Sequence, residues 1–200
     1  MSPQDIRETL IARTISVIAN DGLDKTTTKA ITTGTGINEA YIYRYFAGKE
    51  DLLAKSFEKL DNELLEIVMQ ELPVMSNSAY DFKTRGKMYF TAVWDFMLAN
   101  QEHCIAYVRY FYSTYFTKYS VDFHQQLFAP LVDKFSEAFI EEANVWMILN
   151  HILNVMLDFA VKVHNNQMPE NDDYSEHVFR VIYESVRQYF KEGKESKITV

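Results

Sequence analysis

Residues 26–53 read TTTKAITTGTGINEAYIYRYFAGKEDLL, and this stretch decides the fold of the chain. The Thr27 hydroxyl can cap a short helix over about residues 28–34. Gly36 suits a tight turn, because glycine adopts positive φ at no steric cost. Asn38 can cap a second short helix that runs through Tyr45. Two short helices joined by a glycine-containing turn, after a longer helix, are the parts of a helix-turn-helix reader.

A longer helix is predicted on each side of this stretch. Ser2 can cap the first one, with Pro3 in its first turn and Asp5 three residues after the cap. Gly22 is a natural residue to follow its last turn. The second begins near Lys49, carries acidic residues in its first turn, and continues to about Pro73.

The rest of the chain is predicted to be helical as well. Six Gly and four Pro residues are few for 200 residues, and long stretches lack turn signals, which favours helices over short strands. The predicted helices cover about residues 80–99, 102–118, 123–140, 141–165 and 174–192. We therefore predict an all-α fold, in which a three-helix DNA-binding domain (1–47) is joined to a larger helical domain for ligand binding and dimerisation (48–200).

The charge is unevenly distributed along the chain. Residues 1–50 contain six cations and six carboxylates, so they are neutral, and the remainder carries the whole net charge of −8. A DNA contact must therefore lie on the neutral segment. A single cysteine, Cys104, excludes an intrachain disulfide and favours a reducing, cytoplasmic compartment. No secretory signal is recognisable, and polar residues interrupt the most apolar stretch, so we expect no membrane partner.

Residues 26–53 resemble the signature of the TetR family of transcriptional regulators without a gap, and the resemblance covers about residues 5–55. It implies that the second short helix enters the major groove while neighbouring groups hold phosphates. The residues expected to contact DNA are Thr27, Thr28, Lys29, Asn38, Glu39, Ala40, Tyr41, Tyr43, Arg44, Tyr45 and Lys49. Glu39, Ala40 and Tyr41 take the base-reading positions; Glu39 could accept a hydrogen bond from cytosine N4. Tyr41 is bulkier than the Ser or Thr usual there, which leaves the operator sequence open.

A single short reader contacts too few base pairs to be specific, so we expect a homodimer on a palindromic operator. The helix over 141–165 is apolar nearly all round, and such a helix must bury two faces. The resemblance implies that the last two helices pair across a two-fold axis. The expected interface residues are Ile148, Ile152, Val155, Phe159, Phe179, Ile182, Tyr183 and Val186. A large monomeric core is the alternative interpretation.

Aromatic residues concentrate between residues 107 and 128, and the resemblance implies a pocket there for a small organic ligand. The candidate lining residues are Phe90, Trp94, Tyr107, Tyr110, Phe111, Tyr115, Met147 and His151. Each of these could instead be an ordinary core residue.

The predicted function is a transcriptional regulator, most simply a repressor, released from a double-stranded operator by a small molecule. A transcriptional activator of the same fold, or a helical ligand-binding or protein-interaction module without a DNA role, stays open. We predict no enzyme activity, no catalytic residues, no cofactor and no metal, because the five His residues lack metal-ligand spacing and no glycine-rich phosphate loop occurs.

Overall fold

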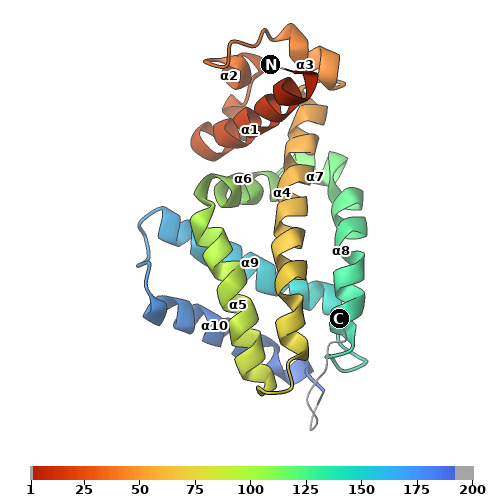
Figure 1. Ribbon diagram of the computed structural model, residues 1–200, viewed down its shortest axis with the longest axis vertical. Coiled ribbons are helices and arrows are strands. Elements are labelled where there is room, and N and C mark those ends of the chain that lie inside the picture. The colour runs from red at the N-terminus through yellow and green to blue at the C-terminus, as the bar shows by residue number, and fades with distance from the viewer. Residues whose placement is uncertain (1, 192–200) are drawn as a thin grey trace. The chain divides into compact units, whose positions relative to one another are not determined.

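The structure, a computed structural model, describes residues 2–191, and within that range the chain is helical with no strands. Figure 1 shows the α-helices, coloured in chain order. The elements are α1 (Pro3–Asp21), η1 (Leu23–Lys25), α2 (Thr28–Thr32), α3 (Ala40–Tyr45), α4 (Lys49–Glu71), η2 (Leu72–Ser76), α5 (Phe82–Ala99), α6 (Gln101–Phe111), α7 (Thr114–Tyr119), α8 (Val121–Ser136), α9 (Val145–His164), α10 (Asp172–Val186) and η3 (Arg187–Tyr189). The all-α prediction is confirmed; the polar tail beyond Gly193 lies outside the described residues.

The chain forms two compact units. Unit 1 contains residues 2–63 and 101–126, and unit 2 contains residues 64–100 and 127–191, so the division falls within α4 and α8. Unit 1 thus combines the predicted reader with the first part of α4, with α6 and α7, and with the start of α8. Whether residues 1–47 form a domain separate from the rest of unit 1 stays a prediction.

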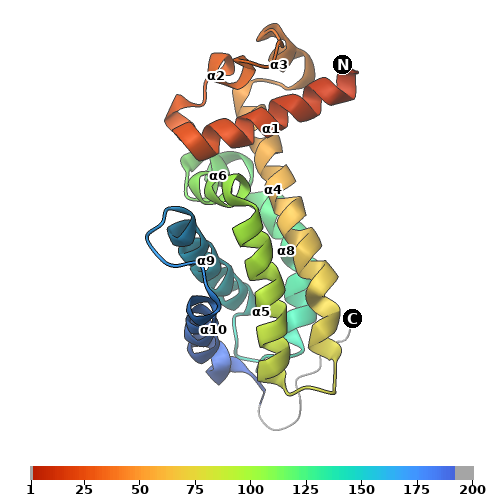
Figure 2. The same ribbon diagram turned by 60° about the vertical axis from the view of Figure 1, so that its left-hand side comes forward.

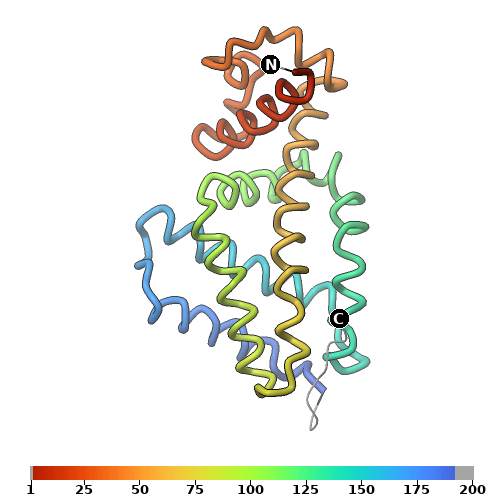
Figure 3. The backbone as a smooth tube through the Cα atoms, in the orientation of Figure 1, coloured from red at the N-terminus to blue at the C-terminus, as the bar shows by residue number. Residues whose placement is uncertain are grey.

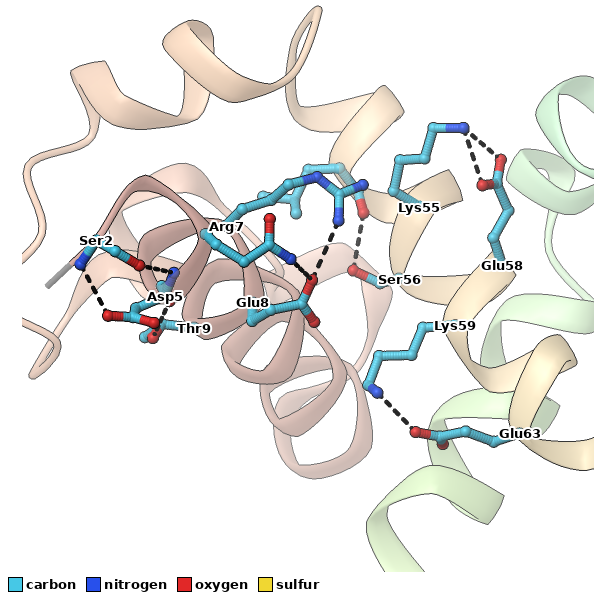
Figure 4. Close-up of polar contacts among 12 residues, drawn as sticks. Ser2, Asp5, Arg7, Glu8, Thr9, Lys55, Ser56, Glu58, Lys59 and Glu63 are labelled. Carbon is cyan, nitrogen blue, oxygen red and sulfur yellow. Dashed lines mark hydrogen bonds and ion pairs between the residues drawn. The ribbon is translucent and has the colours of Figure 1, made fainter.

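The ends of α1 follow from its sequence. The Ser2 hydroxyl accepts a hydrogen bond from the Asp5 backbone N–H (3.2 Å), and the Asp5 carboxylate accepts one from the Ser2 N–H (2.7 Å). Figure 4 shows this reciprocal cap together with the ion pairs along α4. At the other end Gly22 adopts a φ of 90° and its N–H donates to the Ile18 carbonyl.

Within unit 1, α1 lies against α6, as Figures 1 and 2 both show. The contact is polar at both ends. Glu102 of α6 accepts hydrogen bonds from Ser16 (3.2 Å) and Asn20 (2.8 Å), and Arg109 Nη1 donates to the Ile18 carbonyl (2.8 Å). Arg109 therefore gives the Ile18 carbonyl a second donor besides the Gly22 N–H, at the end of α1 where a cation also interacts favourably with the helix dipole.

Several predicted helix boundaries are wrong: α2 ends at Thr32, α8 at Ser136 and α10 at Val186, and local caps explain two further differences. The helix expected over 102–118 breaks at Tyr112, because the Ser113 hydroxyl accepts from the Phe116 N–H and starts α7. The helix expected from residue 141 begins at Val145, because Asn144 accepts from the Met147 N–H (3.0 Å). The tube in Figure 3 shows the chain bending at both places.

Unit 2 is built on mutual packing of α5, α9 and α10. Phe90 and Trp94 of α5 stack with ring centroids 5.7 Å apart, and Phe179 of α10 packs on Phe90 at 5.5 Å. All three side chains are at most 6 % exposed. They form the aromatic centre of this core.

Candidate DNA-binding surface

The reader has a small apolar core of its own. Ile31 of α2 and Ile42 of α3 have no exposed surface, and Phe46, directly after α3, is 5 % exposed. Thr27 accepts a hydrogen bond from the Ala30 N–H (3.1 Å) and thereby begins α2, as predicted. The core and the cap fix the orientation of α2 and α3 relative to each other.

The turn between α2 and α3 depends on two glycines. Gly34 and Gly36 have φ values of 78° and 72°, a conformation that residues with a Cβ rarely adopt. Between them, the Thr35 hydroxyl donates to the Thr32 carbonyl (2.8 Å) and accepts from the Ile37 N–H (3.0 Å). This sets the direction in which the chain enters α3.

The start of α3 differs in detail from the prediction. The Asn38 side chain does accept a hydrogen bond from the Ala40 N–H (2.9 Å), so it caps the first turn, but regular helix begins only at Ala40. Glu39 accepts a hydrogen bond from the Thr28 hydroxyl of α2 (2.5 Å). No local pattern predicts this bond, because it joins residues eleven positions apart across a turn.

The outward side of α3 is aromatic and basic. Tyr43 is 66 % exposed, and Arg44 is exposed beside it. Tyr41 and Tyr45 stack with centroids 6.3 Å apart, and the Arg44 guanidinium lies 5.9 Å from each ring. Such a surface offers stacking planes and a cation, both of which suit contact with a DNA backbone and base edges.

The remaining predicted contacts lie near this surface. Lys29 is exposed on α2, whereas the hydroxyls of Thr27 and Thr28 are engaged in the bonds described above. Lys49 begins α4, and its ammonium group lies 5.9 Å from the centre of the Tyr115 ring of α7. Tyr115, expected in the ligand pocket, therefore contacts a residue expected to hold a phosphate.

The predicted pocket residues fall in two separate sets. Tyr107, Tyr110, Phe111 and Tyr115 belong to unit 1, and Phe90, Trp94, Met147 and His151 belong to unit 2. In unit 1, Tyr107 and Tyr110 pack on Phe57 at 5.0 and 4.8 Å, in an aromatic cluster that also includes Phe111 and Phe116. In unit 2, Met147 is 54 % exposed and His151 bonds to Ser185 at the surface (3.0 Å). Neither Met147 nor His151 is enclosed within the single chain.

The predicted interface residues differ in how far one chain buries them, and their place in an interface stays a prediction. Ile148, Phe179, Ile182 and Val186 are at most 5 % exposed and pack the core of unit 2. Ile152, Val155, Phe159 and Tyr183 are half-buried. The outermost apolar residues of these helices are Met147 and Val181, 54 % and 56 % exposed. Periodicity alone identified two apolar faces but could not tell which faces inward.

A buried polar cluster in unit 1 was missed. Asp61 of α4 accepts a hydrogen bond from the Tyr107 hydroxyl (3.0 Å) and lies 3.0 Å from His124 Nδ1 of α8. Burial raises the pKa of Asp61, and the bonds from His124 and Tyr107 oppose this rise. One signal was available: Asp61 lies four residues after Phe57 and next to Leu60, within the apolar side of α4.

Comparisons with known proteins agree with this geometry. Residues 10–55 match the model of the family described as bacterial regulatory proteins, tetR family, and no curated protein matches the sequence. A TetR-family transcription regulator from Marinobacter aquaeolei VT8 is 16 % identical over 92 % of this chain and 98 % of its own, with a TM-score of 0.73.

Two further solved structures are similar to this chain. A TetR-family transcriptional regulator from Haemophilus influenzae RD is 16 % identical over 96 % of this chain and 100 % of its own, with a TM-score of 0.61. The regulator FadR from Bacillus subtilis, solved with stearoyl-CoA, is 15 % identical over 88 % and 96 %, with a TM-score of 0.63. Residues 10–55 thus match the model of the tetR family of bacterial regulatory proteins, and the whole chain has the fold seen in TetR-family transcription regulators.

Proposed function

We propose that this protein is a cytoplasmic, homodimeric transcriptional repressor that binds a palindromic operator and is released from it by a small organic ligand. The observation that carries the proposal is the exposed surface of α3, where Tyr43 and Arg44 point outward from a segment that matches the tetR family. Residues 1–50, which contain this surface, are electrically neutral, whereas the rest of the chain carries the net charge of −8. Repulsion from the duplex therefore orients the protein with its reader toward DNA.

Dimerisation through α9 and α10 is supported by apolar surface that one chain leaves uncovered. Met147 and Val181 are exposed, and 28 % of the most apolar 18-residue window of α9 is buried. By length and composition alone α9 could also cross a membrane, a criterion that core helices of soluble proteins meet as well. A second copy of the chain would bury this apolar surface. It would also bring a second helix-turn-helix, so that the dimer could contact two half-sites.

Ligand release would act as a population shift. The FadR of Bacillus subtilis was solved with stearoyl-CoA, which supports a small molecule as effector in a protein of this fold. In this chain α4 begins directly after the reader and ends in unit 2. A ligand that favours one position of α4 would change the spacing of the two readers and hence the affinity for operator.

The decisive experiment selects bound duplexes from a random pool and reports both the operator sequence and the half-site spacing. We expect a palindrome, and an affinity that falls steeply with salt because phosphate contacts release counterions. Replacing Tyr43 or Lys49 with Ala should weaken binding to all sequences, whereas replacing Tyr41 or Arg44 should change sequence preference. Tyr112, equally exposed at 68 % but outside the reader, provides the matched control (Tyr112→Ala).

The outcomes separate the alternatives. No duplex binding at low salt would contradict a DNA role and leave a helical ligand-binding or protein-interaction module. A selected operator upstream of a promoter that the protein switches on would indicate an activator. Equal operator affinity across a panel of candidate effectors that bind the protein would contradict release by ligand.

A further inference from the structure

Lys49 is the first residue of α4, directly after the reader, and its side chain extends toward α7. The ammonium group lies over the Tyr115 ring, 5.9 Å from its centre. A cation within about 6 Å of an aromatic ring is attracted by the negative face of that ring. The Lys49 side chain is half-buried, so its ammonium group keeps access to solvent. The contact therefore restricts where the charge lies without removing it from the surface.

The carboxylates next to Lys49 in the sequence do not hold its ammonium group. Asp51 accepts a hydrogen bond from the Ala47 N–H (2.8 Å) instead. Within residues 2–191 no carboxylate lies within ion-pair distance of Lys49. A lysine side chain has many rotamers, and it loses this freedom when it binds a phosphate. A contact that already restricts the side chain in the free protein lowers the cost of that binding.

The Tyr115 ring can act as a fixed plane because α7 is held at both ends by Tyr110 of α6. The Ser113 hydroxyl, before α7, donates to the Tyr110 carbonyl (2.6 Å). The Ser120 hydroxyl, after α7, forms a hydrogen bond with the Tyr110 hydroxyl (3.0 Å). Tyr110 is 1 % exposed, and its ring stacks on Phe57 of α4 with centroids 4.8 Å apart. These contacts anchor α7 to α4, the helix that follows the reader.

Neighbouring rings also set the orientation of Tyr115. Phe116, the next residue, packs on Phe57 in the aromatic cluster of unit 1 (5.3 Å), which fixes the rotation of α7 about its own axis. Tyr119 stacks on Tyr115 with centroids 6.4 Å apart. The ammonium group of Lys118 lies over the Tyr119 ring (4.8 Å), so the exposed cation of α7 has a ring of its own.

We propose that Tyr115 is a positioning residue for DNA binding, whose ring holds the Lys49 ammonium group beside the first turn of α4 for contact with a backbone phosphate. This inference rests on the proposed function, since it adds a residue to the proposed DNA-binding surface. Tyr115 acts through Lys49 and does not itself touch DNA. Its contribution to duplex affinity therefore disappears when Lys49 loses its charge. Because phosphate contacts carry no base information, Tyr115 affects the affinity for every duplex equally.

The test measures the affinity of the full-length protein for a random-sequence duplex over a series of salt concentrations. Tyr115→Leu should weaken binding about two- to fivefold per protomer, as expected for the loss of one exposed cation–π contact. The salt dependence should stay as in wild type, because no phosphate contact is removed. Lys49→Gln should weaken binding and also reduce the salt slope by about one per protomer. In the Lys49→Gln background, Tyr115→Leu should have no further effect.

Three further measurements separate positioning from packing. Tyr115→Phe keeps the ring and should bind as wild type does, whereas trifluorophenylalanine in place of Tyr115 keeps the ring shape but weakens its negative face and should behave like Tyr115→Leu. Tyr112→Leu changes an exposed tyrosine (68 %) just before α7, and this matched control should bind as wild type does. In the free protein the Tyr115 ring current should shift the NMR signal of the Lys49 Cε methylene upfield, and Tyr115→Leu should abolish that shift.

Three outcomes would overturn this inference alone. Additive losses from Tyr115→Leu and Lys49→Gln would mean that Tyr115 acts independently of Lys49. Unchanged or stronger duplex binding by Tyr115→Leu would mean that the ring does not help Lys49 to reach a phosphate. An unshifted Lys49 methylene signal would mean that the contact does not persist in solution. Absence of duplex binding by the wild-type protein is a different result, because it would contradict the proposed function and this inference together.

Discussion

The Nδ1 atom of His124 lies 3.0 Å from Oδ2 of Asp61, and both side chains are at most 4 % exposed. The Tyr107 hydroxyl donates to the other carboxylate oxygen, Oδ1, at 3.0 Å. Three helices of unit 1, α4, α6 and α8, therefore meet at one buried carboxylate. Phe57, Phe111 and Phe116 pack around the His124 ring with centroids 5.5–6.3 Å away, so water has little access to the pair.

Removing one member of this pair should destabilise the protein markedly. His124→Phe preserves a ring of similar size but removes the imidazole from Asp61. Of the two hydrogen bonds described above, the buried carboxylate then keeps the one from Tyr107. We expect a loss of about 3–5 kcal/mol in the free energy of unfolding, against about 1–3 kcal/mol for Tyr107→Phe. Urea unfolding followed by circular dichroism measures both. Lys55→Gln, which breaks the partly exposed Lys55–Glu58 pair seen in Figure 4, should change stability by less than about 1 kcal/mol.

The pH dependence of stability should also report on Asp61. Burial raises the pKa of Asp61 from its usual 3.8, so the folded state holds this proton more tightly than the unfolded chain. The resulting stabilisation is complete below about pH 3.8 and is lost as the pH rises through the folded pKa. Wild type should therefore lose stability relative to Asp61→Asn as pH rises from 4 to 7, by at most about 1.4 kcal/mol per pH unit. A difference that changes in the opposite direction would mean that the bonds from His124 and Tyr107 outweigh burial.

The hydrogen bond from Arg109 to the Ile18 carbonyl should stabilise the end of α1, the first helix of the DNA-binding segment. Arg109→Gln removes a cation that lies at the last turn of α1, where it gives the Ile18 carbonyl a second donor and interacts favourably with the helix dipole. We expect a loss of about 1–2 kcal/mol in stability and faster amide exchange in the last turn of α1. Arg180→Gln, an exposed arginine of α10, is the control. Unchanged exchange in α1 would show that the bonds to Glu102 and the packing of α6 hold the end of α1 without Arg109.

These residues also mark where prediction from the sequence succeeded and where it could not. The caps at Ser2 and Thr27 and the glycine turn at Gly36 were predictable, because each depends on neighbours within a few residues. The Asp61–His124 pair joins residues 63 positions apart, and no local pattern selects that partner. Arg85 illustrates the same limit, since a first-turn arginine is ordinarily exposed and only tertiary packing buries it.

The hydrogen bond between Thr28 and Glu39 should affect how the protein discriminates between operator sequences. Glu39 is exposed at the start of α3, and the Thr28 hydroxyl holds its carboxylate at 2.5 Å. If Glu39 accepts from cytosine N4, Glu39→Gln should reduce discrimination at one operator position by about 1–3 kcal/mol. The same change should raise affinity for random duplex, because it removes a negative charge that repels phosphate. Thr28→Val frees the carboxylate but keeps its charge, so it should relax discrimination without raising random-duplex affinity. Competition binding with operators substituted at each position measures both quantities, and an unchanged base preference in Glu39→Gln would assign Glu39 to repulsion alone.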